Sequence, residues 1–355
     1  MGRTRAFRTV LRRGADAACL LFAACVVVFF ASRYRLAGWP PWFALVNSFA
    51  PFLFLPLPLV TLWAVLRRQR VALAAAGVAL CAFVLVYGRQ LIPKAAVASG
   101  GEAIDVMTFN LGPFLAGPET VAAAIAAADA DIVALQELTP AFERAIRTEL
   151  EARYPYSVLE PESGGRGLLS RFAVEDVAWI QGDGGQRASL SAKITAHGHE
   201  LQVFAPHPTI PEVAWREGWP LPIGLDTSRQ ERQLLDLGER AKASEGSVLV
   251  IGDFNLSDQS RAYRTLTETL DDAFREAGWG FGFTFPHGLR AEHLLPSMFG
   301  IRGIPLPGPL LRLDFIMHSD DMRAESAQVG CDGGSDHCYV RARLLWRSAS
   351  GRASE

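Results

Sequence analysis

The sequence has few cysteines and, in its first quarter, almost no acidic residues. Five cysteines in 355 residues are too sparse for a disulfide scaffold, and neither half is of low complexity, which excludes collagen-like and disordered classes. Of the 35 basic and 37 acidic residues, residues 1–98 hold 12 and one, which leaves residues 99–355 with 23 and 36. This second part has a formal charge of −13 and disfavours nucleic-acid binding, which requires clustered positive charge.

The apolar residues are concentrated near the N-terminus. Three uncharged runs occur at residues 17–32, 36–66 and 71–88, and a helix needs about 20 apolar residues to cross a bilayer. We expect three transmembrane helices near residues 17–32, 38–66 and 71–88, although the five prolines of the second run favour a kinked or partly interfacial segment. A cleaved signal peptide is the alternative for the first run, but the two later runs argue against it.

The charges of the short loops predict the orientation of these helices. The N-terminal prefix and the loop between the second and third runs hold eight Lys or Arg, whereas the loops on the other side hold four. Because positively charged loops stay in the cytoplasm, we expect the N-terminus inside and residues 99–355 outside the cytoplasmic membrane. If the second run entered and left on one face, those residues would face the cytoplasm instead. The expected division is a transmembrane anchor at 1–98, a folded domain at 99–346 and a polar tail at 347–355.

Beyond Pro93 the pattern changes to short β-like runs that alternate with helical runs and are joined by Gly, Pro and Asp turns, which indicates an α/β or α+β domain. Strands are expected at 104–110, 131–137, 167–171, 174–180, 188–195, 201–205, 248–252, 312–318 and 339–346. Helices are expected at 118–129 and 228–242. The Gly/Pro-rich stretch 281–309 is expected to be a long loop, and such loops are usually functional.

Polar side chains interrupt or follow the expected strands where the pattern calls for apolar residues. They are Asn110, Glu137, His207, Asp253, Asn255, Asp314, Asp336 and His337. The chain has only three asparagines, and two of them lie at strand ends beside carboxylates. Together these residues suit a hydrolysis assisted by a hard, oxygen-ligated cation. The structural alternative is that they cap turns or lie solvated at strand ends, as Asp, Asn and Glu commonly do.

Five blocks, in this order, resemble the endonuclease/exonuclease/phosphatase superfamily: VMTFNLG (106–112), DIVALQE (131–137), VIGDFN (250–255), LDFIMHS (313–319) and GGSDH (333–337). The resemblance covers roughly residues 103–345 and implies a DNase I-like four-layer α/β-sandwich, an α+β fold of two packed β-sheets flanked by helices. Further blocks, with the three-run prefix, resemble the membrane-anchored bacterial branch that includes teicoplanin-resistance-associated membrane proteins: APHPTIP (205–211), SRQERQLLDL (228–237) and FTFP (283–286). One departure is Phe315, where family members often have His.

The resemblance implies a Mg²⁺ site, with Mn²⁺ as a substitute. Glu137 would be the principal ligand, and the side-chain carbonyl of Asn110 would help it. Asp336 would be a carboxylate of the outer ligand shell or of a second metal. Mg²⁺ fits because it prefers one or two carboxylates together with waters and substrate phosphate oxygens.

The resemblance also implies the catalytic groups. His337 would contact a phosphoryl oxygen or activate water, and Asp314 would accept its other N–H and so fix the tautomer. Asp253 would orient or deprotonate the attacking water. Asn255 would hold the phosphoryl group, and His207 would donate to another phosphate oxygen.

Cys331 and Cys338 flank the GGSDH block. A disulfide would suit an oxidising compartment, but a separation of seven residues, with one cysteine before a strand and one inside it, favours two free thiols or packed side chains.

These observations predict a membrane-anchored, metal-dependent phosphohydrolase whose site faces away from the cytoplasm. The expected partners are the lipid bilayer and a phosphate-containing substrate such as a lipid-linked phosphate or a phospholipid headgroup, whereas duplex nucleic acid is not expected because of the −13 charge. An extracytoplasmic or periplasmic nuclease is the second hypothesis, and a non-catalytic membrane receptor or scaffold is the third.

Overall fold

The computed structural model describes residues 2–35, 38–94, 101–112, 115, 117–162, 164–182, 186–219, 221–294 and 303–347, with side chains for all of these except 2–11 and 186–188. The expected boundary at residue 98 and the expected tail, apart from Arg347, lie outside the described residues. The chain forms two compact units. The first consists of Met1–Pro40 and Phe49–Ile92, and the second of Pro41–Ser48 and Pro93–Glu355.

The first unit contains three helical stretches that are long and apolar enough to cross a bilayer: Arg12–Arg35, Ala50–Arg67 and Arg70–Gln90. They belong to α1 (Gly2–Arg35), η1 (Ala50–Phe54), α3 (Leu57–Arg67), α4 (Arg70–Tyr87) and η2 (Gly88–Gln90). Their shared core is built from small residues, Cys19, Ala23, Ala64, Ala72 and Ala75, which allow helices to approach closely. Large apolar side chains point outward, as on helices that face lipid.

The expected second span is shorter than the sequence indicated. Residues Pro41–Ser48 form a separate helix, α2, which belongs to the second unit, and the apolar stretch of the first unit resumes at Ala50. The prolines explain the break, because proline is tolerated in the first turn of a helix but interrupts its interior. α2 packs on strand β9 (Gly224–Asp226), where a Cβ on Gly224 would lie 2.7 Å from the Cβ of Pro41.

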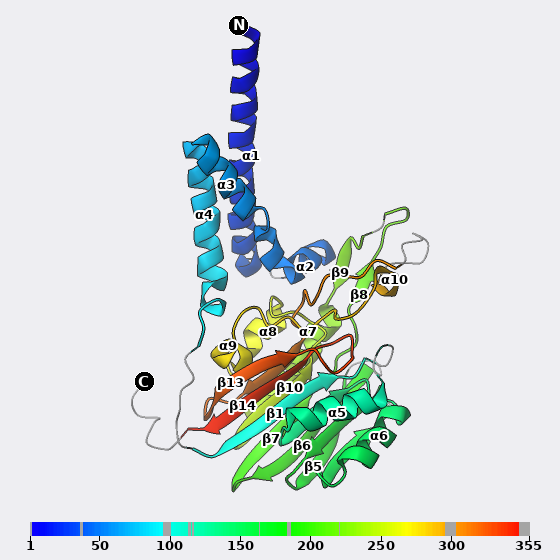
Figure 1. The fold of residues 1–355 in the computed structure, drawn as a ribbon. Helices are drawn as coiled ribbons and strands as arrows, with labels where there is room; N and C mark the ends of the chain where they lie inside the picture. Colours follow the sequence, from blue (N-terminus) through cyan, green and yellow to red (C-terminus); the bar gives the residue numbers. More distant parts are fainter. Residues whose placement is uncertain are drawn as a thin grey trace. The chain divides into compact units, whose positions relative to one another are not determined.

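The second unit is built on two mixed six-stranded sheets, each partly parallel (Figure 1). The first has the order β13-β14-β1-β2-β4-β3, with β1 (Ala103–Asn110), β2 (Ile132–Gln136), β3 (Tyr156–Glu160), β4 (Arg166–Ser170), β13 (Met322–Gly330) and β14 (Tyr339–Trp346). The second has the order β11-β12-β10-β7-β6-β5, with β5 (Val174–Gly182), β6 (Gln186–Ala196), β7 (His199–Ala205), β10 (Ser247–Asp253), β11 (Asp271–Asp272) and β12 (Asp314–His318). A small hairpin pairs β8 (Glu212–Ala214) with β9.

Successive side chains along each strand point to opposite faces of its sheet, and this alternation produces the layers. In β1, Ile104 and Val106 pack in the core between the two sheets, whereas Met107 and Phe109 pack under helices. The first sheet is covered by α5 (Pro118–Ala128) and α6 (Pro140–Leu150), and the second by α7 (Ser228–Ala243) and α8 (Arg261–Leu266). α9 (Ala273–Ala277) and α10 (Ala291–Leu294) are short. The expected four-layer, DNase I-like sandwich is therefore confirmed.

The expected strands and helices are all present with ends shifted by up to two residues, and others were not foreseen. β3 and β13 are edge strands, and their polar or half-buried residues give no clear alternation. The expected loop 281–309 contains α10 and two isolated bridges, Phe285 with Leu311 and Arg290 with Pro305. Residues 295–302 of that loop lie outside the described residues.

Candidate active site

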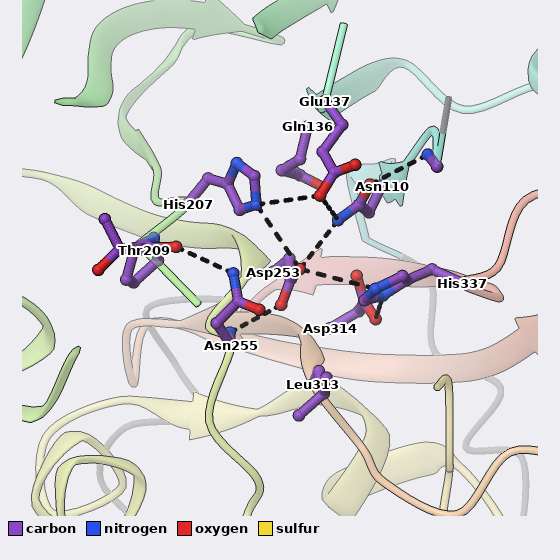
Figure 2. A network of polar contacts seen from close by, with 12 residues as sticks. Asn110, Gln136, Glu137, His207, Thr209, Asp253, Asn255, Leu313, Asp314 and His337 are labelled. Carbon is purple, nitrogen blue, oxygen red and sulfur yellow. Dashed lines mark hydrogen bonds and ion pairs between the residues drawn. The ribbon is translucent and has the colours of Figure 1, made fainter. Parts of the chain in front are cut away.

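The polar strand ends meet at one edge of the sandwich (Figure 2). β1 runs parallel to β2, and β7 runs parallel to β10, so the carboxyl ends of each pair lie side by side. Asn110 is the last residue of β1, and Glu137 follows β2. Asp253 is the last residue of β10, and His207 lies two residues after β7. The two sheets thereby bring residues far apart in the sequence into one cluster.

Asn110 links the carboxylates of the two sheets. Its Nδ2 donates to Asp253 Oδ2 at 3.0 Å and to Glu137 Oε1 at 3.3 Å. Its Oδ1 accepts from the backbone N–H of Gly112 at 3.2 Å. In this arrangement the amide bridges two acids, and the expected ligand role of its carbonyl requires the amide to turn.

The turn that carries Glu137 depends on a close approach of two backbones. Glu137 has a φ of +56°, and the following Leu138 donates its N–H to Gly165 O at 3.1 Å. Gly165 has a φ of +62°, and a Cβ there would lie 2.2 Å from Leu138 O, so only glycine fits. The Glu137 side chain keeps 22% of its surface exposed, which leaves it accessible to a ligand.

His207 is buried beside the same carboxylates. Its Nε2 lies 3.8 Å from both Glu137 Oε1 and Asp253 Oδ2. Arg166, itself buried, donates from Nη2 to the backbone oxygen of His207 at 3.3 Å. Arg166 was not among the expected site residues, although a charged residue at the head of the apolar GLLS strand was a signal in the sequence.

The GDFN segment is held by its own side chains. Asn255, at a φ of +50°, donates its backbone N–H to Asp253 Oδ1 at 2.7 Å. Its Nδ2 donates to Pro208 O at 2.9 Å. A Cβ on Gly252 would lie 2.2 Å from Pro206 O, so this glycine lets β10 approach the segment that carries His207.

His337 and Asp314 form a buried pair. Nδ1 of His337 lies 2.9 Å from Asp314 Oδ2, and its Nε2 lies 3.9 Å from Asp253 Oδ2. Asp314 stands directly opposite Asp253 in the pairing of β12 with β10. Ser335 fixes the loop, because its Oγ accepts from the His337 backbone N–H at 3.0 Å and donates to Asn110 O at 2.8 Å.

The pKa values of this pair follow from burial and charge. Burial opposes protonation of His337, but the carboxylates of Asp314 and Asp253 prevail and raise its pKa to about 10. Burial, and next the charge of Asp314, raise the pKa of Asp253 to about 7. At neutral pH His337 is therefore a cation, and Asp253 is poised to exchange a proton.

The donor set fits a hard divalent cation. The carboxylates of Glu137 and Asp253 are joined through Asn110, and ligand atoms of Asp253, Asp314 and His337 lie within 4.8 Å of one another. Protonated His337 cannot bind a metal ion, which leaves the carboxylates as the metal ligands. The buried Oδ1 of Asp314 has no hydrogen-bond partner in the described part of the chain. Carboxylates removed from water need compensating positive charge, and oxygen-rich sets favour hard cations over zinc.

Asp336 differs from the other expected site residues in its contacts. The carboxylate of Asp336 lies 3.4 Å from Ser335 Oγ and against Gly112, where a Cβ would lie 2.0 Å from its Oδ1. Within the described part of the chain, this carboxylate makes no hydrogen bond to the side chain of Glu137 or Asp253. It lies beside Gly112 and Ser335, close enough for its charge to help raise the pKa of His337.

The expectation of free thiols at Cys331 and Cys338 is wrong, because the two form a disulfide with a Cα–Cα distance of 4.3 Å. The separation along the chain was misleading. Gly330 pairs with Tyr339 in the β13–β14 hairpin, so the next residue on each strand faces the other across the ladder. The disulfide closes the loop that carries Ser335 and His337.

Two packed sheets with acids and histidines at their shared edge are the arrangement of the DNase I-like fold. The family model described as Endonuclease/Exonuclease/phosphatase family matches residues 107–337, and the chain belongs to this family. Members of the family are generally divalent-metal-dependent phosphoesterases or nucleases. No curated protein sequence matches the chain significantly.

Solved structures share the fold. Truncated Caenorhabditis elegans TDP2 is 17% identical, with a TM-score of 0.52 over 68% of this chain and 98% of that one. D. rerio TDP2 complexed with single-strand DNA product is 17% identical, with a TM-score of 0.51 over 68% and 99%. An endonuclease/exonuclease/phosphatase from Bacteroides vulgatus is 18% identical, with a TM-score of 0.50 over 69% and 100%. Identities this low establish similarity of fold alone.

Proposed function

We propose that the protein is a membrane-anchored phosphohydrolase that uses Mg²⁺, or Mn²⁺ in its place, to cleave a phosphoester or pyrophosphate bond in a lipid-linked phosphate or phospholipid headgroup. The site would face the outer side of the cytoplasmic membrane, and the protein would belong to the branch that includes teicoplanin-resistance-associated membrane proteins. One observation carries the proposal. The chain combines the cluster of Glu137, Asp253, Asp314 and His337 with three candidate spans, and the segment between the first two spans is part of the catalytic unit.

Chain topology supports full crossing by the second and third spans. The catalytic unit takes α2 from before these spans and Pro93–Glu355 from after them. Both pieces must lie on one side of the membrane, so an even number of crossings separates them. A second run that enters and leaves on one face, followed by a crossing third run, would separate α2 from β9 by a bilayer. Because the Lys- and Arg-rich loops stay in the cytoplasm, an even number of crossings after α2 favours an extracytoplasmic catalytic unit.

The disulfide and the charge support the same placement. Disulfides such as Cys331–Cys338 persist in oxidising compartments outside the cytoplasm. The charge of −13 on residues 99–355 disfavours a polyanionic nucleic acid and suits a substrate that the bilayer presents.

The mechanism assigns complementary roles to the two sheets. Glu137, with Asn110 and with Asp336 further out, would hold the cation, which would offset the negative charge of the phosphoryl group. Asp253, with a pKa near 7, would orient the attacking water and accept its proton. Protonated His337 would donate from Nε2 to a phosphoryl oxygen, since Asp314 holds its Nδ1.

The second sheet's loops would complete the phosphate contacts. His207 Nε2, 3.8 Å from two carboxylates, would donate to another phosphate oxygen. Nδ2 of Asn255 donates to Pro208 O, which favours a role in holding the segment that carries His207 over direct contact with phosphate. No nucleophilic Ser or Cys is required, because phosphoryl hydrolysis depends mainly on positioning and charge.

A nuclease is the second candidate, because a structure that shares the fold holds a single-strand DNA product. The test assays the purified full-length protein with Mg²⁺ against duplex DNA, single-strand DNA, undecaprenyl pyrophosphate and phospholipids. We expect hydrolysis of a lipid substrate, reduced at least about 10²-fold in Asp253→Ala and His337→Ala with thermal stability retained. Asp320→Ala, at an exposed aspartate, is the matched control. Cleavage of DNA alone would establish the nuclease, and no hydrolysis of any substrate would favour a receptor.

A further inference from the structure

The β8–β9 hairpin exposes an unusual number of large apolar side chains. Six of the fourteen residues from 210 to 223 are large, apolar and 37–62% exposed: Ile210, Val213, Trp215, Trp219, Leu221 and Ile223. Trp42 of α2 is 58% exposed as well. We call the six residues of the hairpin the apolar edge. Concentrated exposed apolar surface of this kind marks a binding surface.

The two faces of the hairpin differ. Ala214 pairs with Gly224, and this face of small residues packs on α2, as the approach of Gly224 to Pro41 shows. Val213 and Trp215 point to the opposite face, because side chains alternate along a strand. The ladder continues from Ala214 to Ile223 through the Ile223 N–H to Ala214 O bond of 2.8 Å. Figure 1 shows the hairpin beside α2, projecting from the body of the two sheets.

Chain connectivity identifies what lies next to this hairpin. Only Phe49 separates Ser48, the end of α2, from Ala50, the start of the second candidate span. Two residue steps reach at most about 7 Å, and the five residues between Arg35 and Pro41 reach about 20 Å. If these stretches span the bilayer, α2 lies at its surface. β9 packs on α2 within the same unit, so the hairpin lies at that surface too.

We infer that the apolar edge inserts into the interface of the bilayer that carries the anchor and holds the catalytic unit against it. Tryptophan suits this position, because its ring is apolar and its N–H can remain hydrated among the headgroups. The inference rests on the proposed membrane anchoring and not on the identity of the substrate.

The position of the apolar edge in the bilayer interface affects how close the active site lies to the lipid. His207 precedes Ile210 by three residues, so the hairpin leaves directly from the site. α2 is tied to the loop that follows β10, because the buried Nδ2 of Asn47 donates to Gln259 O at 2.8 Å, four residues after Asn255. With the apolar edge in the bilayer interface, the segment that carries His207 leaves β7 only three residues before that edge, which suits a phosphate that projects from a lipid.

The test uses the full-length protein in nanodiscs that contain either ordinary or brominated phospholipid, because bromine quenches tryptophan only on contact with the acyl region. We expect Trp215→Phe with Trp219→Phe to remove a part of the bromine-quenched emission. Trp179→Phe is the matched control, since Trp179 is 37% exposed, like Trp215, but lies on edge strand β5. It should leave the quenched emission unchanged, and Trp63 of α3 gives a background common to all variants.

Unchanged quenching in the double variant would overturn the inference. Protection of Trp215 and Trp219 from both bromolipid and aqueous iodide would also overturn it and would identify a protein partner or a second copy instead. Activity gives a separate readout. Trp215→Ala with Trp219→Ala should raise the KM for a bilayer substrate about tenfold, a loss of about 1.4 kcal/mol, with turnover of a soluble phosphodiester unchanged. If no substrate is hydrolysed, the proposed function fails while the quenching result still decides the seating.

Discussion

Replacing Asp314 by Asn tests whether the negative charge of Asp314 keeps His337 protonated. The change keeps the size of the side chain and leaves an oxygen that can accept from His337 Nδ1, now 2.9 Å from Asp314 Oδ2. It removes the charge that raises the pKa of His337 to about 10 against the effect of burial. In Asp314→Asn we therefore expect the pKa of His337 to fall, so that the ring loses its positive charge at a lower pH than in the wild type.

The expected loss of rate follows from the strength of the hydrogen bond that His337 would donate to the phosphoryl group. A hydrogen bond to a charged group contributes about 1.5–3 kcal/mol, which corresponds to about 10- to 150-fold in rate. The pH profile should move as well. In the wild type we expect activity to rise as Asp253 loses its proton near pH 7 and to fall as His337 loses its proton near pH 10. Without the charge of Asp314, both pKa values fall, so both limbs shift to lower pH.

The assay is kcat against pH at saturating Mg²⁺ for wild type, Asp314→Asn and the control Asp320→Asn. The control aspartate is exposed and lies beyond the end of β12, so its profile should match the wild type. Wild-type turnover in Asp314→Asn, or an alkaline limb that stays in place, would refute the proposed role of the His337–Asp314 pair.

Three further predictions concern the metal, the topology and the buried ion pair. EDTA should abolish activity and Mg²⁺ or Mn²⁺ should restore it, with Glu137→Gln needing more metal; restoration by Zn²⁺ alone would contradict the oxygen-ligand assignment. Alkaline phosphatase fused after Glu355 should be active and a fluorescent protein there dark, with the reverse for fusions near Gln69; a cytoplasmic C-terminus would reject the outward orientation. Burial opposes ionisation of Asp272, but the charge of Arg312 prevails and lowers the pKa of Asp272 from 3.8 to about 2. The pair therefore adds about 2 kcal/mol to the free energy of unfolding above pH 4, and this contribution is lost as the pH falls through 2. Thermal unfolding should therefore show Asp272→Asn destabilised at pH 7, with a smaller deficit at pH 2.5; an equal deficit at both pH values would contradict this.

The strand ends were the predictable part of the site. Asn110, Glu137 and Asp253 each end or follow an apolar run, and parallel pairing brings such ends together whatever their distance in the sequence. Arg166 could not be assigned in advance, because its function depends on a backbone carbonyl 41 residues away.

The other differences have similar causes. α2 belongs to the same uncharged run as the second span, and the prolines of that run did not reveal that α2 would pack on β9 as part of the second unit. The Cys331–Cys338 disulfide depends on the register of β13. β13 is an edge strand, and its polar residues lack the alternation that would identify a strand from the sequence. Local composition predicts elements, whereas register and long-range packing depend on the whole fold.

The discontinuous catalytic unit affects how the protein is made. Asn47 bonds to Gln259 across 212 residues of chain, and two candidate spans lie between α2 and β1. If both spans cross the membrane as proposed, α2 is synthesised first and must wait until they have inserted and the rest of the unit has emerged. Folding of the enzyme is then coupled to membrane insertion, and a shortened protein that starts at residue 99 lacks a helix of its own fold, which leaves Gly224 and the surface around it uncovered.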